Sequence, residues 1–259
     1  MITVAFNKYQ GAGNDFVMID NRGNQINPDD VVLINKLCDR RFGIGADGLI
    51  LVSDHNILDF EMKYFNADGK LGSMCGNGGR CTAHFALKHG IAGKTQKFMA
   101  FDGPHEAQVE DDIVRLQMAD VKSFRMVDNN YFINTGSPHY VLFRDDVDSI
   151  NVNEEGKKIR WSDKFAPGGT NVNFVQVIDN GLKIRTFERG VEEETLACGT
   201  GVTASAIAAV LKGHFDTSPV NVRARGGNLK VEFRIENNEI TNVWLTGPAT
   251  FVFEGRIEI

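Results

Sequence analysis

The chain has 259 residues, of which 42% are hydrophobic and 24% are charged, and its formal net charge is −6. This acidic balance, with no basic patch interleaved with aromatic residues, argues against nucleic acid or an anionic membrane as the main partner. The four cysteines, at positions 38, 75, 81 and 198, have no CxxC spacing, so the usual zinc and thioredoxin motifs are excluded and no metal site is expected.

Targeting and membrane signals are also missing from the sequence. Residues 1–8 lack a basic segment followed by a long apolar run, so no signal peptide is expected. The longest apolar run, residues 202–211, is too short to span a bilayer. We therefore expect a cytoplasmic protein whose cysteines are thiols.

The first part of the chain mixes strand and helix patterns. Strands are predicted at residues 2–6 and 16–19, around a glycine-rich turn at 11–15, followed by a helix at 29–40 and strands at 49–52 and 60–64. Residues 43–48 match GxGxxG, but a helix precedes them and a strand follows, which reverses the order of a dinucleotide site. We interpret them as a tight turn lining a cleft, and Cys38 and Cys81 as core residues.

An apolar helix follows a cysteine at two places. Cys75 precedes a helix predicted at residues 77–89, and Cys198 precedes one at 200–212 that is apolar nearly all round. Such a helix must be enclosed on every side, which fits a helix threaded through a curved sheet. Between the two helices we predict strands at 106–109, 113–118, 140–143, 171–177 and 182–187, and an exposed charged segment at 144–164. Strands at 220–224, 229–235, 240–245 and 251–259 complete the chain.

The two cysteines are 123 residues apart, and other landmarks share this offset. Gly13 and Gly136, Gly48 and Asn171, and Gly90 and Gly213 are related in the same way. The strand before each cysteine aligns at 122, so one extra residue is expected at 191–194. A duplication explains the pattern and predicts two similar domains, residues 1–120 completed by the final strand at 250–259, and residues 121–249.

Thiols at helix starts favour acid–base chemistry. Backbone N–H groups and the helix dipole stabilise a thiolate there, and repulsion between two facing thiols lets one ionise while the other stays protonated. A base and an acid on opposite faces of one carbon invert its configuration, which is racemisation or epimerisation. The N–H groups of Gly76, Asn77, Gly199 and Thr200 would bind the substrate's carboxylate, so no pyridoxal phosphate would be required.

The sequence resembles the diaminopimelate epimerases, which are cofactor-independent, two-thiol enzymes, along its whole length. The matching segments are residues 11–16 (GAGNDF), 43–48 (GIGADG), 65–69 (FNADG), 75–78 (CGNG), 138–139 (PH), 170–172 (TNV), 188–190 (ERG) and 197–201 (ACGTG). The resemblance implies an α/β (α+β) fold of two pseudo-symmetric, duplicated domains, each a curved, mostly antiparallel sheet around a central helix, with the site in the cleft.

The resemblance also implies a reaction and a set of site residues. LL-diaminopimelate would be converted to the meso form, a precursor of lysine and of peptidoglycan, by a homodimer without a cofactor, although the residues alone leave the oligomeric state open. Cys75 and Cys198 would exchange the α-proton, and His139 and Glu188 would help set the protonation of the pair. The substrate's amino and carboxylate groups would be held by Asn14, Asn66, Asn171, Glu188 and Arg189.

Some positions depart from the family pattern, and other functions stay open. Ser137 stands where many members have asparagine and Gly48 where some have glutamine, which weakens the transfer of contacts there. A proline-racemase-like enzyme is one alternative, but its first motif usually has histidine in place of Asn77. A phenazine-type isomerase lacks the cysteine pair. A redox or ligand sensor with a reversible Cys75–Cys198 disulfide is the alternative from another class. Which thiol is ionised at rest is also open.

Overall fold

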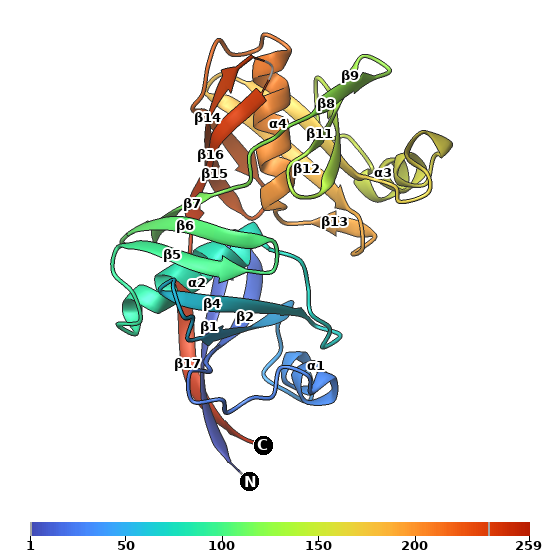
Figure 1. Cartoon of the computed structure of the whole chain (residues 1–259). Helices are drawn as coiled ribbons and strands as arrows, with labels where there is room; N and C mark the ends of the chain where they lie inside the picture. Colours follow the sequence, from blue (N-terminus) through green and yellow to red (C-terminus); the bar gives the residue numbers. More distant parts are fainter. Residues whose placement is uncertain (1, 238) are drawn as a thin grey trace. The chain divides into compact units, whose positions relative to one another are not determined.

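The computed structural model describes residues 2–237 and 239–259, and the chain divides into two compact units (Figure 1). Unit 1 comprises Met1–Leu116 and Pro248–Ile259, and unit 2 comprises Gln117–Gly247. In the described part of the chain, no helix combines the length and the apolar character needed to cross a membrane.

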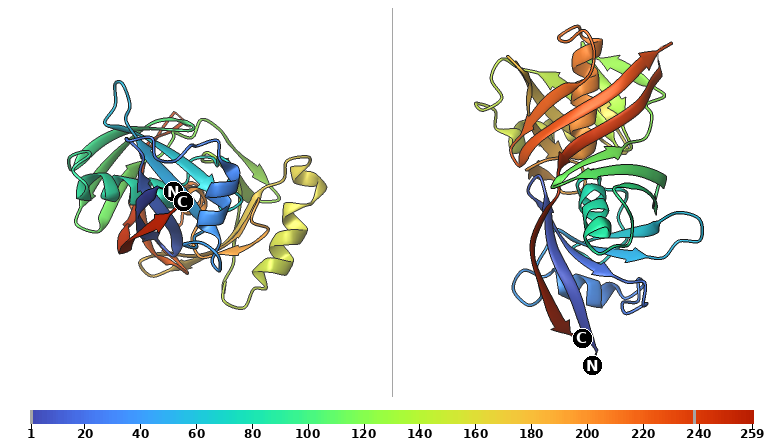
Figure 2. Two further views of the ribbon diagram at one scale, coloured as in Figure 1. Left: turned by 90° about the horizontal axis from the view of Figure 1, so that it is seen from below. Right: turned by 90° about the vertical axis from the view of Figure 1, so that its left-hand side faces the viewer.

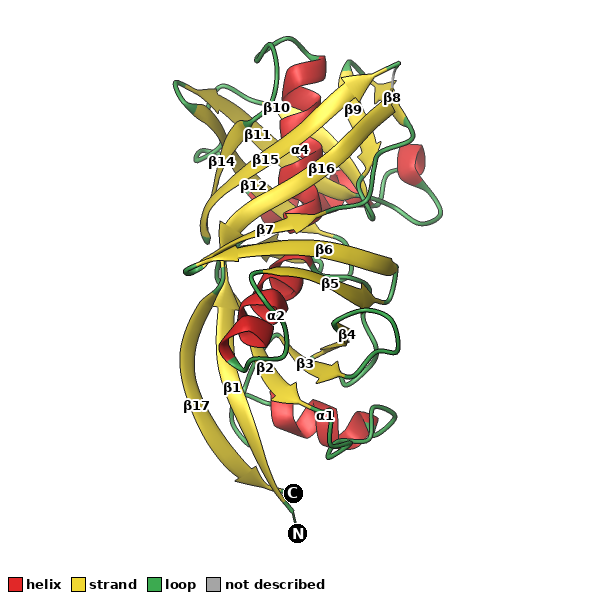
Figure 3. Ribbon diagram, turned by 60° about the vertical axis from the view of Figure 1, so that its left-hand side comes forward, coloured by secondary structure: helices red, strands yellow, loops and turns green. Residues whose placement is uncertain are grey.

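Unit 1 is a curved sheet around one long helix, α2 (Figure 3). Its elements are β1 (Thr3–Gly11), β2 (Asn14–Asp20), α1 (Val31–Cys38), β3 (Gly48–Ser53), β4 (Phe60–Asn66), α2 (Gly76–Lys88), β5 (Thr95–Ala100), β6 (Gly103–Glu110), β7 (Ile113–Gln117) and β17 (Thr250–Glu258). The pairings β2–β3 and β4–β5 are parallel, and the pairings β17–β1, β1–β2, β3–β4, β5–β6 and β6–β7 are antiparallel. The N–H of Ile2 donates to the carbonyl of Ile259 at 2.9 Å, so the first and last strands end side by side (Figure 2).

Unit 2 has the same construction around α4. Its elements are β8 (Phe124–Val127), β9 (Asn130–Asn134), β10 (Pro138–Phe143), α3 (Val152–Arg160), a 3-10 turn (Asp163–Phe165), β11 (Asn171–Ile178), β12 (Gly181–Glu188), β13 (Glu193–Thr195), α4 (Gly199–Leu211), β14 (Val220–Ala224), β15 (Gly227–Glu236) and β16 (Glu239–Pro248). The pairings β10–β11 and β12–β14 are parallel, while β8–β9, β9–β10, β11–β12, β14–β15 and β15–β16 are antiparallel. The predicted fold class, a mostly antiparallel curved sheet around a central helix in each repeat, is confirmed.

The duplication extends to the strand register. Phe16 pairs with Gly48 between β2 and β3, and His139 pairs with Asn171 between β10 and β11. Each residue of the second pair is 123 positions after its counterpart in the first. Leu49 pairs with Phe65 and Val172 with Phe187, so here the offset changes from 123 to 122. Unit 2 therefore has one residue fewer between the two strands and one more before Cys198.

The segment predicted to be exposed and charged, residues 144–164, is mostly exposed and contains helix α3, which was not predicted. Asn151 caps this helix by accepting the N–H of Glu154 at 3.3 Å, and Lys158 pairs with Glu154 at 2.7 Å. A Cβ at Gly156 would lie 2.4 Å from Phe187, so the glycine lets the helix approach β12 closely. The duplication offset, applied to the helix predicted at 29–40, would have placed a helix here.

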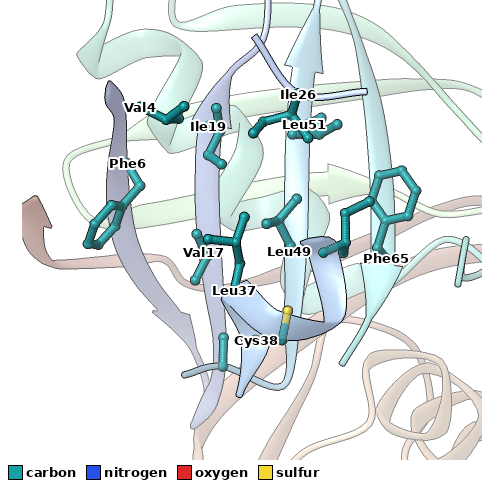
Figure 4. Packing of buried hydrophobic residues seen from close by; sticks show 12 residues of the cluster. Val4, Phe6, Val17, Ile19, Ile26, Leu37, Cys38, Leu49, Leu51 and Phe65 are labelled. Carbon is teal, nitrogen blue, oxygen red and sulfur yellow. The ribbon is translucent and has the colours of Figure 1, made fainter. Parts of the chain in front are cut away.

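Each central helix is enclosed as its composition requires. Most residues of α4 are buried, including Gly199 and every residue from 201 to 209, and the helix packs against β9, β10, β11, β12, β14 and β15. In unit 1, Cys38 on α1 joins a separate apolar core with side chains of β1 to β4 (Figure 4). The core interpretation of Cys38 and Cys81 holds, because these thiols are 2% and 0% exposed.

Candidate active site

A cysteine is the N-cap residue of each central helix. Cys75 has φ −108° and ψ 114° before α2, and Cys198 has φ −109° and ψ 111° before α4. The helices that follow, Gly76–Lys88 and Gly199–Leu211, are both 13 residues long. The same backbone therefore presents a sulfur atom at the amino end of a buried helix in each unit. Both helices begin one residue earlier than the sequence predicts, because the cysteine itself is the cap.

The thiol of Cys75 contacts groups that suit both of its protonation states. Its Sγ accepts the N–H of Gly78 at 3.5 Å and donates to Oδ1 of Asn14 at 3.6 Å. The amide nitrogen of Asn14 in turn donates to Asp47 at 2.7 Å, which fixes the orientation of the amide. The turn between β1 and β2 thus brings Asn14 to the thiol.

Asn14 rests on an ion cluster made by Lys8, Asp15, Arg40 and Asp47. Asp15 lies 2.6 Å from Arg40 and 2.7 Å from Lys8, and Arg40 also lies 2.7 Å from Asp47. Burial opposes the ionisation of Asp15, but hydrogen bonds from Arg40 and Lys8 outweigh it and hold its pKa well below the usual range. The carboxylate of Asp15 therefore stays charged, and its ion pairs with Arg40 and Lys8 hold the loop that carries Asn14.

In unit 2 a chain of polar groups leads to Cys198. The Sγ of Cys198 lies 3.4 Å from the hydroxyl of Thr200, and that hydroxyl lies 2.8 Å from Nε2 of His139. Asn173 lies 3.1 Å from Nδ1 of the same imidazole. His139 comes from β10 and Asn173 from β11, so parallel pairing of two neighbouring strands assembles this chain beneath the start of α4.

Thr186 on β12 determines how the protons are arranged in this chain. It donates to Oδ1 of Asn173 at 3.0 Å, so the amide nitrogen of Asn173 faces the imidazole and donates to Nδ1. A neutral imidazole then carries its proton on Nε2 and donates it to Thr200. The hydroxyl proton of Thr200 is left for the sulfur of Cys198, which favours negative charge on that sulfur.

His139 is neutral at ordinary pH. It is fully buried, and this burial, aided by the charge of Arg189, lowers its pKa to about 3. The imidazole therefore serves as a fixed hydrogen-bond donor toward Thr200 and does not change its charge between pH 5 and 9.

A second polar group in unit 2 centres on Asn171 and Ser137. The amide nitrogen of Asn171 donates to the hydroxyl of Ser137 at 2.9 Å, and its oxygen accepts the backbone N–H of Arg189 at 2.8 Å. The guanidinium of Arg189 also reaches Ser137 at 3.4 Å. Ser137, a departure from the family pattern, thus orients two of the predicted binding residues. Glu188, the last residue of β12, stands directly before Arg189.

The predicted residues therefore fall into two groups, one in each unit. Unit 1 places Asn14 against Cys75 at the start of α2, while Asn66 is exposed at the end of β4, paired across the strands with Gly48. A Cβ at Gly48 would lie 2.4 Å from the carbonyl of Phe65, so this backbone leaves no space for a longer residue there. Unit 2 holds His139, Asn171, Glu188, Arg189, Cys198, Gly199 and Thr200.

Sequence reasoning missed Asn173 and Thr186. Both are almost completely buried, at 0% and 2% exposure, and they pair across β11 and β12. One signal was available, because Asn173 lies two residues after Asn171 and so points to the same face of its strand. Among the described residues, no group of three or more histidine, cysteine or acidic side chains has the arrangement of a metal site.

Comparisons with known proteins identify the family of the chain. The family model described as diaminopimelate epimerase matches residues 6–123 and 131–252. A diaminopimelate epimerase from Flavobacterium psychrophilum is 51% identical over 252 residues, covering 96% of this chain and 98% of the relative. One from Aquifex aeolicus is 42% identical over 275 residues, covering 97% of each chain.

Solved structures of low sequence identity share the fold. A phenazine biosynthesis protein of the PhzF family from Bacillus anthracis has a TM-score of 0.80 at 14% identity and covers 100% of both chains. A hydroxyproline epimerase from Agrobacterium vitis has a TM-score of 0.72 at 12% identity, covering 98% of this chain and 92% of the other. With the family model matched over most of its length, the chain belongs to the diaminopimelate epimerase family.

Proposed function

We propose that the chain interconverts LL-diaminopimelate and meso-diaminopimelate by moving the α-proton between Cys75 and Cys198, in the formation of lysine and peptidoglycan precursors. The observation that supports this most is the repeated N-cap cysteine. Two thiols stand on the same backbone geometry, each at the amino end of a buried helix. Membership of the family supports the substrate.

In the proposed reaction both thiols act in each turnover. The thiolate of one cysteine takes the α-hydrogen, and the electron pair of the broken C–H bond passes into the neighbouring carboxylate. The thiol of the other cysteine then donates its proton to the opposite face of the carbon. The configuration is inverted, and the two cysteines have exchanged protonation states. The reverse reaction begins from that exchanged state.

The negative charge that develops on the substrate's carboxylate needs donors that are already in place. In the proposal the helix starts supply them, through the N–H groups of Gly76 and Asn77 in unit 1 and those of Gly199 and Thr200 in unit 2. Oriented N–H groups of this kind stabilise a developing oxyanion by about 3 to 4 kcal/mol each. The carboxylate then serves as the electron sink, so the mechanism needs no pyridoxal phosphate.

The far end of diaminopimelate carries its own amino and carboxylate groups. In the proposal Arg189 forks onto this carboxylate, Glu188 takes the ammonium group, and Asn14, Asn66 and Asn171 complete the set. The hydrogen bonds from Asn171 and Arg189 to Ser137 support this assignment, because they hold both side chains before substrate arrives. Such preorganisation favours a long zwitterion over a small apolar amino acid such as proline.

His139 acts on Cys198 in this proposal through the hydroxyl of Thr200. The neutral imidazole donates to Thr200, and Thr200 donates to the thiolate when Cys198 is the base. Glu188 would adjust the protonation of the pair from the substrate side. A cytoplasmic location and a homodimer complete the proposal, and sedimentation of the purified chain measures the oligomeric state.

The test is proton NMR of LL-diaminopimelate in deuterated water with the purified chain under reducing conditions. We expect loss of the α-hydrogen signal and formation of the meso isomer, and neither in Cys75→Ser or Cys198→Ser. L-proline in the same assay tests the racemase alternative. No exchange of the α-hydrogen by the folded wild type would contradict the proposal. Cysteine variants that keep ligand affinity and lose only a redox response would indicate a sensor.

A further inference from the structure

Arg80 is a completely buried cation on α2. Its side chain is 0% exposed, and it donates to three neutral acceptors, the Pro248 carbonyl at 3.3 Å, the Gly76 carbonyl at 3.2 Å and Oδ1 of Asn77 at 2.9 Å. Within residues 2–237 and 239–259, it forms no ion pair with a carboxylate. Burying a charge without a counter-charge is costly, so a guanidinium kept here requires an explanation.

The duplication shows that the carbonyl in the first turn of the central helix does not need a charged donor. The residue 123 positions after Arg80 is Thr203, whose hydroxyl donates to the carbonyl of Gly199 at 3.0 Å. Gly199 is the repeat equivalent of Gly76, which accepts from Arg80. The same first-turn carbonyl is thus satisfied by a neutral hydroxyl in unit 2 and by a guanidinium in unit 1. Satisfying this carbonyl therefore does not explain the positive charge in unit 1.

The groups near Arg80 that can become negative are thiols. Burial lowers the pKa of the Arg80 guanidinium, and negative charge on Cys81 or Cys75 would raise it. Burial raises the pKa of Cys81 to about 12, so this thiol stays protonated. Cys75 is only partly buried, and its sulfur already accepts one backbone N–H. Cys75 is therefore the side chain whose ionised form the guanidinium can balance.

Two other sets of titratable side chains on or against α2 have partners of their own. His84 lies 3.1 Å from the hydroxyl of Tyr9 and 3.3 Å from Asp112, toward the far end of the helix. The ion cluster of Lys8, Asp15, Arg40 and Asp47 contacts Asn14 through Asp47. The remaining titratable side chains on α2, at its end and on the strands packed against it are Lys88, His89, Asp20, Glu61, Lys63, Tyr64, His105, Glu106, Glu110, Glu254, Arg256 and Glu258.

We propose that Arg80 is a positioning residue whose buried charge stabilises the thiolate form of Cys75. It acts through the peptide that joins Gly76 to Asn77, because a guanidinium bound to the carbonyl of this peptide polarises it toward the amino end of the helix. Asn14, which accepts the S–H of Cys75, holds the thiol form. Both protonation states of Cys75 are then supported, as a two-base reaction requires. This inference deepens the proposed function and rests on it.

The experiment measures the reactivity of Cys75 without substrate. In a Cys198→Ala background, the rate of alkylation of Cys75 by iodoacetamide is followed against pH by mass spectrometry. We expect Arg80→Gln, which keeps amide donors but loses the charge, to raise the pH midpoint by about one unit or more. Arg80→Lys keeps the charge and should raise the pH midpoint less. Thr203→Val, the matched change in unit 2, should leave it in place.

The outcomes separate clearly. A folded Arg80→Gln variant with an unchanged midpoint overturns the inference. If this variant does not fold by circular dichroism, the parent decides: a Cys75 midpoint clearly below the usual thiol value of about 8.5 supports the inference, and one at or above it overturns it. If the midpoint shifts but the protein never exchanges the α-hydrogen of diaminopimelate, the effect of Arg80 on Cys75 is supported and the proposed substrate is rejected. If the α-hydrogen is exchanged but the midpoint does not shift, the proposed function is supported and the role of Arg80 is rejected.

Discussion

Replacing His139 by glutamine should remove a pH-dependent part of the stability of unit 2. The imidazole is fully buried and its pKa is lowered to about 3, whereas an unfolded histidine titrates near 6.5. The folded pKa lies below the unfolded one, so the unfolded state gains a proton first as the pH falls. The stabilisation is therefore complete above about pH 6.5 and is lost progressively as the pH falls toward about 3.

The magnitude follows from the same two values. A pH of 5.0 is about 1.5 units below the pKa of the unfolded histidine, which is therefore almost fully protonated, while the folded histidine remains neutral. Each unit is worth about 1.4 kcal/mol, so wild type loses about 2 kcal/mol from this group between pH 7.5 and 5.0. His139→Gln lacks the titrating group, so the stability difference between the two proteins should shrink by that amount.

The assay is urea unfolding followed by tryptophan fluorescence at the two pH values. The chain has two tryptophans, Trp161 and Trp244, and both lie in unit 2 with His139. Carboxylates and the other histidines contribute equally to both proteins and cancel in the comparison. His214→Gln, a change at an exposed imidazole, is the control and should follow wild type closely. A wild-type minus His139→Gln difference that is the same at pH 7.5 and pH 5.0 would refute the reasoning.

Three further changes test the two polar groups of unit 2. Thr200→Val removes the hydroxyl between the imidazole and the thiol and should lower kcat about ten- to a hundredfold with little change in KM, measured by α-hydrogen exchange. Ser137→Ala removes the acceptor shared with Arg189 and should mainly raise KM in steady-state kinetics. Gly201→Ala would put a Cβ 2.4 Å from a buried amide oxygen and should lower both activity and thermal stability, whereas Gly93→Ala, with open space, should change neither.

The two central helices could be predicted closely from the sequence, for a simple physical reason. Helix α4 is apolar nearly all round, which is distinctive, and a cysteine followed by glycine marks the start of the central helix in both repeats. The offset of 123 residues then predicted equivalent strands, and the register of Phe16 with Gly48 and of His139 with Asn171 follows it. Helix α3 was missed because its surface is charged and its apolar face is narrow, although Asn151 and Glu154 carry a capping signal.

The polar network around His139 was beyond sequence reasoning. The contact between Asn173 and Thr186, which are 13 residues apart in the chain, depends on the register of β11 and β12, and a shift of one residue would turn one of the two side chains to the other face. Arg80 was missed for a different reason. A single charge in an apolar helix is normally read as a solvent-facing residue, and only its burial reveals that it is a constraint on the site.

The two thiols have the same backbone geometry but different side-chain support, and the proposed reaction gives a reason for this. Turnover exchanges their protonation states, so the two ionised forms must lie close in free energy, or one direction would start from a rare state. Identical surroundings would not achieve this, because in the proposed reaction a chiral substrate presents different groups to each sulfur. A charge at Arg80 and a neutral chain from His139 through Thr200 are two independent means of adjusting that balance. Weakening one, as in Arg80→Gln, should therefore shift the resting proton toward Cys75, and a Thr200→Val change in the same protein should partly reverse the shift.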